Sequence, residues 1–526
     1  MNYICGSHCF IMSKQYNITL LDCSLRDGGY YNNWDFEEDF VDFYRTKIDL
    51  LPFEYIEIGY RNLVQKEYRG KYFYTPSPIL DQWASISSKL VLMLDEINTP
   101  IDEVEKMILP CKGKVKMFRV ATKPERIKSG IQLAKKIKEH GFEVGLNVMY
   151  LSDWDKHDDL FENFNGIEKF IDYLYMADSF GAVLPDYIEK IVLRIKSITS
   201  VKLGYHGHNN LEMGLINALT AIEHGVEIID SSVTGMGRGA GNLKTELLLA
   251  YLGSNNTKEV NFEALNALVD RFEHLQKSYN WGNNLAYMVS GANSIPQKEV
   301  MNLITRRFYN IDNAIKLLGI KNGAQEVLTF PKINIEFPKE KILIIGGGAS
   351  VINHKSSIQS FIKQNNDLHV LFSSARHLKL FDNISSAFNI LVGSEGKRLE
   401  ENMTIETFSN HCILPPPPHK ISPYIPNGIA RFCVELNETI FSVDNADAHL
   451  AVTLQAAIEL KAKQVYLVGF DGYTAAELNE REAFFMHENQ LIFDHFLENN
   501  GGVSMHSLTP TQYQNIPVTS IYAEIK

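Results

Sequence analysis

The rest of the chain is interpreted from one stretch of sequence, Leu20-Leu21-Asp22-Cys23-Ser24-Leu25-Arg26-Asp27-Gly28-Gly29. Its apolar start predicts a β-strand that runs directly into an Arg–Asp pair and two glycines. Glycine allows a sharp backbone turn, so we expect both charged side chains to lie at the end of the strand. A buried carboxylate needs a cation. The pair alone is therefore explained equally well by a structural salt bridge and by a functional site.

A second stretch, Gly204-Tyr205-His206-Gly207-His208-Asn209-Asn210, ends another apolar strand far downstream. Alternate side chains of a strand point to the same face, so His206 and His208 should project together. Two imidazoles and one carboxylate form a facial site for a divalent metal ion. A lone His-x-His pair is more often solvated or packed than metal-binding, and it gains weight here only beside the first stretch.

A third stretch, Gly235-Met236-Gly237-Arg238-Gly239-Ala240-Gly241-Asn242, is a glycine-rich loop that follows the next predicted strand. Loops after the last two strands of an eight-stranded barrel often hold phosphate through backbone N–H groups. Gly237 and Gly239 are therefore candidate substrate-binding residues, and a phosphorylated substrate stays open. The alternative is that the loop closes over a metal ion.

Eight strand–helix units are expected over the first half of the chain. Predicted strands begin near Ile18, Glu54, Leu90, Val115, Phe142, Tyr173, Val201 and Val226. Amphipathic helices lie between them, for example at 125–140 and 211–224, each followed by glycine. Eight units in ~250 residues predict a TIM (β/α)8 barrel, with an open doubly wound sheet as the alternative. Active sites of such barrels lie at the carboxyl ends of the strands, where Glu57, Arg119 and Asp178 are predicted to line the pocket.

In this order, the three motifs resemble the metal-dependent (DRE-TIM) lyase and aldolase superfamily, and within it the 4-hydroxy-2-oxovalerate aldolases. The resemblance covers residues 18–318. It implies that Asp27, His206 and His208 bind a divalent metal ion, and that Arg26 stabilises an enolate. Asn242 is implied as a further ligand or as a loop-closing residue. Mn²⁺ and Mg²⁺ are the expected ions: mixed imidazole and carboxylate ligation suits Mn²⁺, and Mg²⁺, Co²⁺ and Zn²⁺ stay open as alternatives.

The activity that the resemblance implies is that of an aldehyde-lyase. It would cleave or form a C–C bond in a 4-hydroxy-2-oxo acid through pyruvate enolate chemistry. The related aldolases carry a histidine base two residues after the Gly of Arg-Asp-Gly, where this chain has Tyr30. Tyrosine, with a usual pKa of ~10, is a poor base unless its surroundings lower that pKa. The exact substrate therefore stays open and includes sugar-derived acids; Tyr287 is a second candidate for the proton transfer, or simply a core tyrosine.

Two other classes of function remain. The first is an acetyl-CoA-dependent Claisen-type acyltransferase of the isopropylmalate-synthase type. Those enzymes typically have Glu-Gln after Arg-Asp-Gly and Asp after His-x-His-Asn, whereas this chain has Gly29-Tyr30 and Asn210. The second is a glycan-related transferase or assembly protein dominated by the end of the chain. The complete set of metal ligands argues against a barrel without catalysis.

A length of 526 residues predicts more than one domain. We expect a barrel at 17–260, a helical extension over its mouth at 261–320, a linker at 321–339 and a separate Rossmann-like α/β domain at 340–526. In the last part, a strand at 341–345 runs into the turn Gly346–Ser350, and a later strand runs into Asp471. The dinucleotide fingerprint is incomplete, so a nucleotide or nucleotide-sugar site and a pure assembly role both stay open. This part also faintly resembles sialyltransferase-type domains of bacterial surface-glycan pathways, which implies a role in surface-glycan sugar biosynthesis as one expectation.

The composition of the chain limits which partners and which cellular compartment are expected. A net charge of −12 argues against nucleic acid or an anionic membrane surface as the main partner. No apolar run approaches the ~20 residues of a membrane span. Six cysteines are too few for a disulfide framework, which favours a reduced, cytoplasmic setting. We expect a small 2-oxo acid as substrate and a homo-oligomeric protein.

Overall fold

The computed structural model describes residues 17–66, 68–157, 159–306, 330–334, 338–381, 384, 386–404, 408–416, 424–437, 448–473, 480–499 and 501–525. The chain forms two compact units, residues 1–300 and 301–526, which are described separately below. Most of the linker predicted at 321–339, and the end of the predicted helical extension, lie outside the described residues.

The first unit is built on a closed barrel of eight parallel strands in chain order, with β8 paired to β1. The strands are β1 Thr19–Asp22, β2 Tyr55–Tyr60, β3 Lys89–Asp95, β4 Met117–Thr122, β5 Glu143–Val148, β6 Tyr173–Asp178, β7 Lys202–Gly207 and β8 Ile228–Ser231. They begin close to the eight positions expected from the sequence. The predicted TIM barrel is confirmed, and the open-sheet alternative is wrong.

The inside of the barrel consists of an apolar layer below a charged layer. Tyr55 and Met117 belong to a buried cluster inside the barrel. Two residues further along the same strands, and therefore on the same face, stand Glu57 and Arg119. Both charged side chains are completely buried. Because buried charges are costly unless they are paired, the upper layer depends on ion pairs for its stability.

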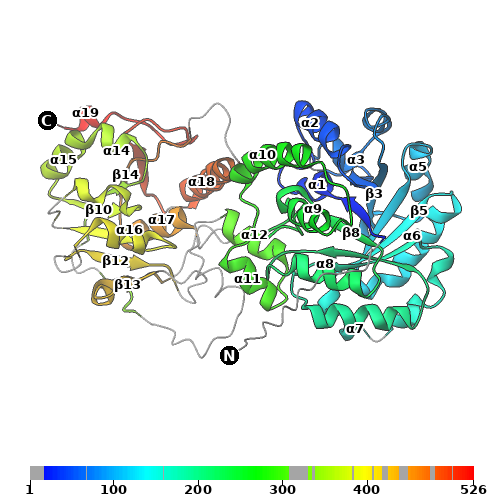
Figure 1. Ribbon diagram of the computed structural model, residues 1–526. Coiled ribbons are helices and arrows are strands. Elements are labelled where there is room, and N and C mark those ends of the chain that lie inside the picture. Colours follow the sequence, from blue (N-terminus) through cyan, green and yellow to red (C-terminus); the bar gives the residue numbers. More distant parts are fainter. Residues whose placement is uncertain are drawn as a thin grey trace, which may run out of the picture. The chain divides into compact units, whose positions relative to one another are not determined.

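Helices surround the barrel strands (Figure 1). They are α1 Ser24–Gly28, α2 Glu38–Ile48, α3 Lys71–Tyr74, α4 Ser77–Asp81, α5 Val104–Ile108, α6 Ile127–Glu139, α7 Pro185–Lys196, α8 Gly214–Glu223 and α9 Thr245–Ser254. Helix α6 shows why they pack there: Ile127, Ile131, Ala134 and Ile137 recur every three or four residues and are buried as one stripe. The helix stops at Gly141, whose φ of +85° suits glycine after a helix end. The connection between β5 and β6 differs, because it contains the 3₁₀ helices η4 Leu151–Lys156, η5 Phe161–Phe164 and η6 Ile167–Lys169.

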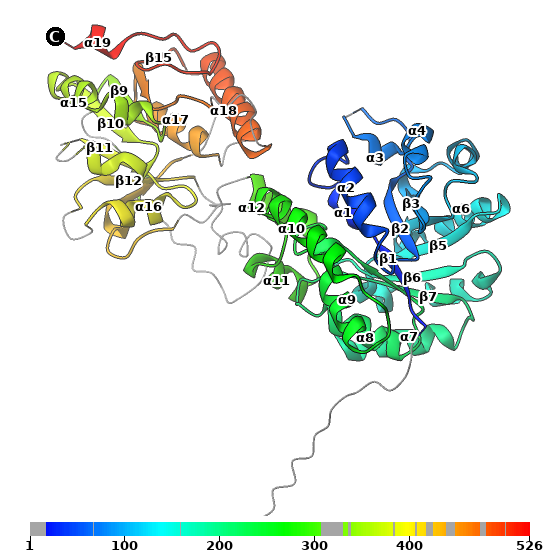
Figure 2. The same ribbon diagram turned by 45° about the horizontal axis from the view of Figure 1, so that its top comes forward.

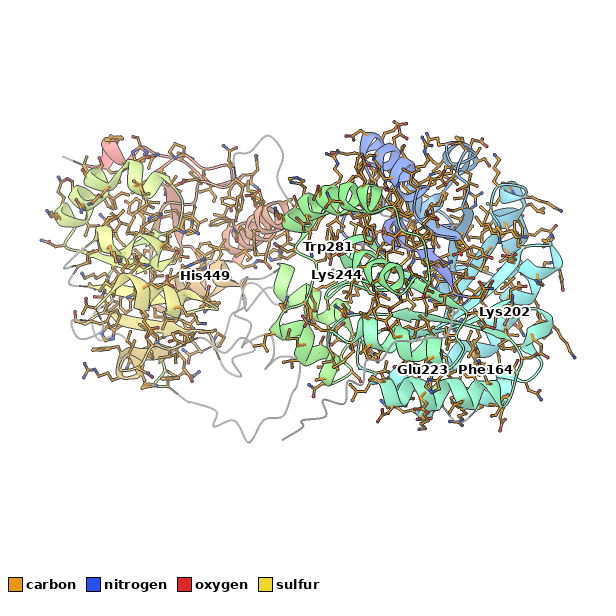
Figure 3. The ribbon with its side chains drawn as sticks, in the orientation of Figure 1. Phe164, Lys202, Glu223, Lys244, Trp281 and His449 are labelled. Atoms are coloured by element: carbon orange, nitrogen blue, oxygen red, sulfur yellow. The ribbon has the colours of Figure 1, made fainter. Side chains whose placement is uncertain are left out.

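The predicted helical extension is represented by α10 Phe262–Tyr279, α11 Leu285–Ala292 and α12 Gln297–Arg306. Helix α10 packs on α2, where the rings of Phe40 and Phe272 have centroids 5.1 Å apart. Between α10 and α11, the buried Trp281 donates its Nε1–H to the carbonyl oxygen of Thr234, 3.1 Å away, beside the glycine-rich loop (Figure 3). The extension is therefore attached to the loop that follows β8.

The second unit contains a parallel sheet, which within the described residues has seven strands in the order β13-β12-β11-β10-β9-β14-β15. They are β9 Lys341–Ile345, β10 Leu368–Phe372, β11 Ala387–Ile390, β12 His411–Leu414, β13 Cys433–Glu435, β14 Gln464–Val468 and β15 Ser504–Ser507. The chain starts in the middle at β9, builds outward to β13, and then continues from β14 on the other side. This is a doubly wound sheet whose order reverses between β9 and β14.

The two faces of this sheet are covered by different helices (Figure 2). The helices are α14 Ser350–Asn353, α15 Lys355–Gln364, α16 Glu395–Asn402, α17 His449–Glu459, α18 Glu480–Asn499 and α19 Ile521–Glu524. In β9, Ile342 and Ile344 pack with α17 and α18, while Leu343 and Ile345 pack with α15 and α16. A continuous apolar run such as 342–345 is typical of a parallel sheet buried on both faces. A Rossmann-like role for this sheet stays a prediction.

Among the described residues, none of the helices combines the length and the apolar character that crossing a membrane requires.

Candidate active site

The Arg26–Asp27 pair lies at the carboxyl end of β1, inside the short helix α1. The two following glycines do not serve the sharp turn that the sequence led us to expect, since Gly29 has an ordinary helical φ of −59°. They are required by close packing instead. A Cβ atom on Gly28 would lie 2.4 Å from the sulfur of Met236, and one on Gly29 would lie 2.0 Å from the Trp34 ring.

A chain of buried ion pairs joins Arg26 to the charged layer of the barrel. The Arg26 guanidinium donates to Asp27 through Nη1 and to Glu57 through Nε, at 2.6 Å for the latter. Glu57 also accepts from Arg119 at 3.1 Å, and Arg119 donates to Asp230 at 2.7 Å. Glu57 and Arg119, predicted to line the pocket, thus hold one another and orient Arg26. The Nη2 atom of Arg26 is buried and has no hydrogen-bond partner among the described residues.

His206 and His208 lie together, with ring centroids 5.2 Å apart. Nδ1 of His206 is 2.9 Å from a carboxylate oxygen of Asp230, and Nδ1 of His208 is 3.0 Å from the carbonyl oxygen of Ser179. Because both of these oxygens only accept, each Nδ1 carries the proton, which leaves Nε2 with its lone pair in the neutral ring. Burial, followed by the proximity of His206, lowers the pKa of His208 to about 3, so its ring is neutral near pH 7.

Asp27 is ionised at neutral pH. Burial opposes its charge, but the adjacent Arg26 guanidinium outweighs that effect and holds the pKa of Asp27 well below its usual value. Its Oδ2 atom lies 3.5 Å from Nε2 of His206. Two acceptor atoms that face each other at this distance favour a cation between them.

These donor atoms fit a divalent metal ion. Cys23, Asp27 and His206 each offer a ligand atom within 4.8 Å of the others, and His208 adjoins this group. Burial holds the pKa of the Cys23 thiol well above its usual value, so Cys23 is the weaker donor of the three. Oxygen and nitrogen donors of this kind are those that Mg²⁺ and Mn²⁺ accept.

Asn242 connects the glycine-rich loop to the Asp27 carboxylate. Its Nδ2 donates to Oδ2 of Asp27 at 2.6 Å, while its Oδ1 is buried without a partner in the described part of the chain. A Cβ atom on Gly237 would lie 2.7 Å from the Asn242 side chain. One on Gly239, which has a φ of +62°, would lie 2.1 Å from Gln297. The Asn242 side chain at Gly237 and the positive φ of Gly239 favour glycine at these positions, and their predicted contact with substrate stays a prediction.

Tyr30, which replaces the expected histidine, is paired with a second tyrosine. Its hydroxyl lies 2.9 Å from that of Tyr60, the last residue of β2. The guanidinium of Arg238 stands 4.4 Å from the centre of the Tyr30 ring, a cation–π arrangement. The Nε atom of Arg238 is buried and, among the described residues, has no partner.

The remaining predicted residues serve mainly to build the walls. Asp178 accepts backbone N–H groups of Ala182 and Val183 at 3.0 and 3.3 Å, and burial raises its pKa to about 6. Tyr287 is buried in α11, and its ring edge lies 2.8 Å from where a Cβ of Gly239 would be. Asp178 thus ties down the loop after β6, and Tyr287 packs on the glycine-rich loop; their predicted roles toward substrate are not tested by these contacts.

Asn210 joins the His-x-His strand to the helical extension. Its Nδ2 donates to the carbonyl oxygen of Tyr287 at 3.0 Å, and its Oδ1 accepts from Gln297 at 2.8 Å. Gln297 in turn accepts from the N–H of Ala240 at 3.2 Å. Strand β7, helices α11 and α12 and the glycine-rich loop are therefore locked together above the histidines.

Sequence reasoning overlooked several residues of this site. Asp230 is one of them: it accepts from Arg119 at 2.7 Å and lies 2.9 Å from Nδ1 of His206. Its place two residues after the inward-facing Ile228 was a usable signal. Arg238 stood inside the quoted glycine-rich loop, where an arginine among glycines is itself unusual. Cys23 and Tyr60 gave no signal, because buried cysteine and tyrosine are ordinary core residues.

Known proteins resemble the barrel part of the chain. A family model described as HMGL-like matches residues 17–270. The 4-hydroxy-2-oxovalerate aldolase of Geobacillus thermodenitrificans is 30% identical over 247 residues, which are 46% of this chain and 71% of that protein. The one from Moorella thermoacetica is 32% identical over 246 residues, 45% of this chain and 70% of that protein. A crystal structure of the N-terminal domain of a candidate aldolase from Bacteroides vulgatus is 46% identical, with a TM-score of 0.54, and the match covers 55% of this chain and 98% of that one.

Proposed function

The chain belongs to the HMGL-like family, and on that premise we propose that its barrel is a divalent-metal-dependent aldolase that acts on a 4-hydroxy-2-oxo acid. The observation that carries this proposal is the arrangement around Asp27. An ionised carboxylate, two histidines whose Nδ1 atoms are bound to other groups, and an arginine whose Nη2 has no partner among the described residues all lie at the carboxyl end of the barrel. This is where barrels of this kind carry their active sites.

Asp27, His206 and His208 would hold the metal ion, and Asn242, which is bonded to Asp27, has an Oδ1 atom without a partner among the described residues. When bound, Mn²⁺ or Mg²⁺ polarises the keto group of the substrate as a Lewis acid. The protein itself orients the metal-binding rings, because Asp230 and the Ser179 carbonyl oxygen accept from Nδ1 of His206 and His208. Such outer partners typically raise metal affinity and activity ten- to a hundred-fold.

Arg26 is suited to the negative charge that develops during cleavage. Removal of the proton from the 4-hydroxyl lets the C3–C4 bond break. Its electron pair forms the C2–C3 double bond of an enolate, and the aldehyde leaves. The guanidinium is held by Asp27 and Glu57, so its unused Nη2–H group is preorganised for the enolate oxygen. A fixed donor of this type contributes ~3 kcal/mol to a transition state.

We assign removal of the 4-hydroxyl proton to Tyr30, because the Tyr30 hydroxyl is hydrogen-bonded to that of Tyr60 at 2.9 Å. In cleavage Tyr30 acts as the tyrosinate: Tyr60 donates to its oxygen and stabilises the negative charge before the transfer, and Tyr30 becomes neutral when it takes the proton of the 4-hydroxyl. Arg238, next to the Tyr30 ring, has a buried Nε–H without a partner in the described part of the chain and is assigned to the substrate carboxylate. Arg26 would then bind the enolate oxygen and Arg238 the carboxylate. Two fixed arginines at these two groups favour a small 2-oxo acid as substrate.

The test is a cleavage assay on the full chain after chelation and readdition of Mn²⁺ or Mg²⁺. Substrates are 4-hydroxy-2-oxo acids of increasing length, including sugar-derived 3-deoxy-2-oxo acids, with pyruvate as the measured product. Metal-dependent pyruvate release from at least one of them is expected. Thiol release from acetyl-CoA with a 2-oxo acid runs in parallel. Thiol release without any pyruvate release would replace the aldolase proposal by the Claisen-type one.

A further inference from the structure

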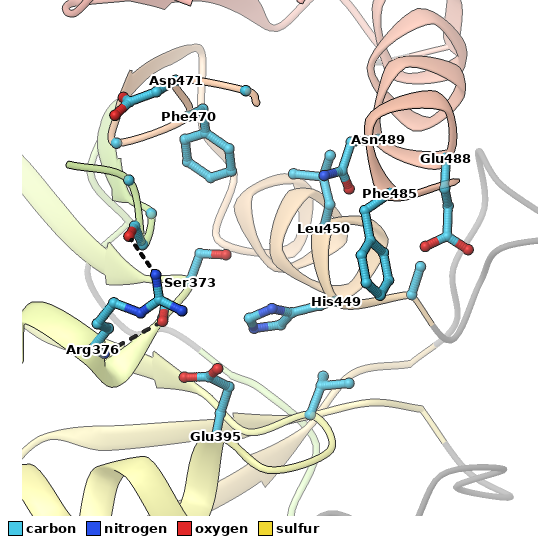
Figure 4. A pocket seen from close by; sticks show the side chains of 18 of the residues that line it. Ser373, Arg376, Glu395, His449, Leu450, Phe470, Asp471, Phe485, Glu488 and Asn489 are labelled. Carbon is cyan, nitrogen blue, oxygen red and sulfur yellow. Dashed lines mark hydrogen bonds between the residues drawn. The ribbon is translucent and has the colours of Figure 1, made fainter. Parts of the chain in front are cut away.

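The second unit holds a cavity of about 370 Å³ at the carboxyl edge of its sheet (Figure 4). It is lined by the turns after β9, β10, β11 and β14 and by the first residues of α17. The strand order reverses between β9 and β14, and ligands of open α/β sheets bind at such a reversal. The volume lies in the range of ~300–1,000 Å³ that is typical of small-molecule sites.

The glycine turn after β9 is already occupied. The carboxylate of Asp471 accepts the N–H of Ser350 at 2.8 Å and also the Ser350 hydroxyl. A Cβ atom on Gly348 would lie 2.6 Å from that carboxylate. The turn and Asp471 were expected to face a ligand together. Because they bind each other, an anionic group has no place at the start of α14.

The positive charge available to a ligand comes from the neighbouring turn. Arg376, in the 3₁₀ helix η8 Ala375–Leu380, is exposed, and within the described residues its guanidinium donates a single hydrogen bond, from Nη1 to the carbonyl oxygen of Gly347 at 3.2 Å. The other arginine of the cavity, Arg398, is bound to Glu395. An anionic group in the cavity would therefore lie at Arg376.

The floor of the cavity contains a hydrogen-bond acceptor. Nε2 of His449 is buried and has no partner among the described residues, whereas the Ser373 backbone hydrogen-bonds to the same ring. Burial lowers the pKa of His449, so the imidazole is neutral. A buried acceptor without a partner costs ~1–3 kcal/mol, and a hydroxyl group of a ligand would remove that cost.

Two aromatic side chains supply an apolar wall. Phe470 follows β14 and packs on Phe493, with ring centroids 5.9 Å apart, and Phe485 projects from α18 on the other side of the cavity (Figure 4). A planar ring buries its faces well against such side chains. The cavity therefore offers a surface for a ring, an acceptor for a hydroxyl and a cation for an anion.

We propose that this cavity binds a nucleotide, with its base against Phe470 and Phe485, a sugar hydroxyl at Nε2 of His449 and its phosphate at Arg376. His449 lies between Arg376 and Phe485 (Figure 4), so the three features follow the order of the phosphate, the sugar and the base of one molecule. The site is independent of the aldolase chemistry of the barrel, so either proposal stands if the other fails.

The test is calorimetric titration of the full chain with CMP, UMP, AMP and GMP, with the four parent nucleosides and with inorganic phosphate. At least one nucleotide should bind saturably and about tenfold or more tightly than its nucleoside. Arg376→Ala should abolish that difference and leave nucleoside binding unchanged. Phe485→Leu, which keeps an apolar side chain, should weaken nucleotide and nucleoside together.

Lys379→Ala is the matched control, because Lys379 is an exposed cation of the same 3₁₀ helix that bonds to the Glu401 carbonyl instead. It should bind like the wild type. Arg376 is exposed, so its variant tests the phosphate site even if Phe485→Leu unfolds. The proposal is overturned if no nucleotide binds at about 1 mM, or if Arg376→Ala keeps the full preference for nucleotide over nucleoside.

Discussion

The barrel and the second sheet both gather polar side chains at the carboxyl ends of parallel strands, but they use that position differently. In the barrel, Arg26, Glu57 and Arg119 come from three different strands or strand ends and bind one another in a buried chain. In the second unit, Glu395 and Arg398 pair within a single helical turn beside an open cavity. Closure of a sheet brings all strand ends into one ring, whereas an open sheet offers a slot at the reversal of its order.

This difference predicts how far a substitution propagates. A charge removed from the barrel leaves a buried partner uncompensated, which typically costs 3–5 kcal/mol when one member of a buried pair is deleted. A charge removed from the rim of the cavity is replaced by water. Substitutions in the barrel should therefore alter chemistry and stability together, and those in the cavity should alter binding alone.

The largest effect is expected from Asp27→Asn. The amide cannot provide the negative charge that both the metal ion and Arg26 require, so kcat/KM should fall by ~10³-fold or more, with loss of bound metal by elemental analysis. Glu37→Gln, an exposed carboxylate at the start of α2 without a capping bond, is the control and should behave as wild type. Wild-type activity in Asp27→Asn would contradict the assignment of the site. Nucleotide binding by the second unit should not change.

Tyr30→Phe should lower the cleavage rate by ~10²-fold, because it removes only the hydroxyl that exchanges the proton. Deuterium exchange into pyruvate, which does not require proton removal from the 4-hydroxyl, should be affected much less. Equal loss in the two assays would mean that Tyr30 supports the structure through its Tyr60 and Trp34 contacts rather than the chemistry.

Arg238→Ala should raise KM for the 2-oxo acid by ~10-fold or more and change kcat less, because a carboxylate anchor acts in the ground state and the transition state alike. Arg238→Lys should restore part of the affinity, since it keeps the charge without the forked geometry. If kcat falls and KM stays constant in both variants, Arg238 acts on the reacting atoms instead.

The smallest effect on rate is expected from Gln297→Ala. This substitution removes the hydrogen bonds that join α12 to Asn210 and to the glycine-rich loop. It leaves the N–H of Ala240 and an oxygen of Asn210 without partners, so the free energy of unfolding should fall by ~2 kcal/mol. Thermal unfolding measures that loss, and cleavage should slow only a few-fold. Lys298→Ala, an exposed neighbour in the same helix, should change neither.

Much of the fold was accessible from the sequence because local patterns carry it. Eight apolar strands separated by amphipathic helices give the barrel, and strand ends such as Arg26-Asp27 and His206-Gly-His208 mark its mouth. The apolar strand at 341–345 likewise indicated a second parallel sheet. Periodicity of 2 and 3.6 residues is a property of the chain itself, so it needs no knowledge of distant partners.

Only the tertiary structure decided which of these residues hold one another. Asp230 lies beside His206 because β7 and β8 are neighbours in a closed ring, and nothing local in either stretch announces that contact. Asn242 reaches Asp27 across 215 positions of sequence. Gly28 and Gly29 proved necessary for the side chains that approach them rather than for a turn, and Asp471 proved to fill the glycine turn it was expected to flank. Such pairings follow from the closure and layering of sheets, which bring atoms together irrespective of their separation along the chain, and a linear pattern does not contain that information.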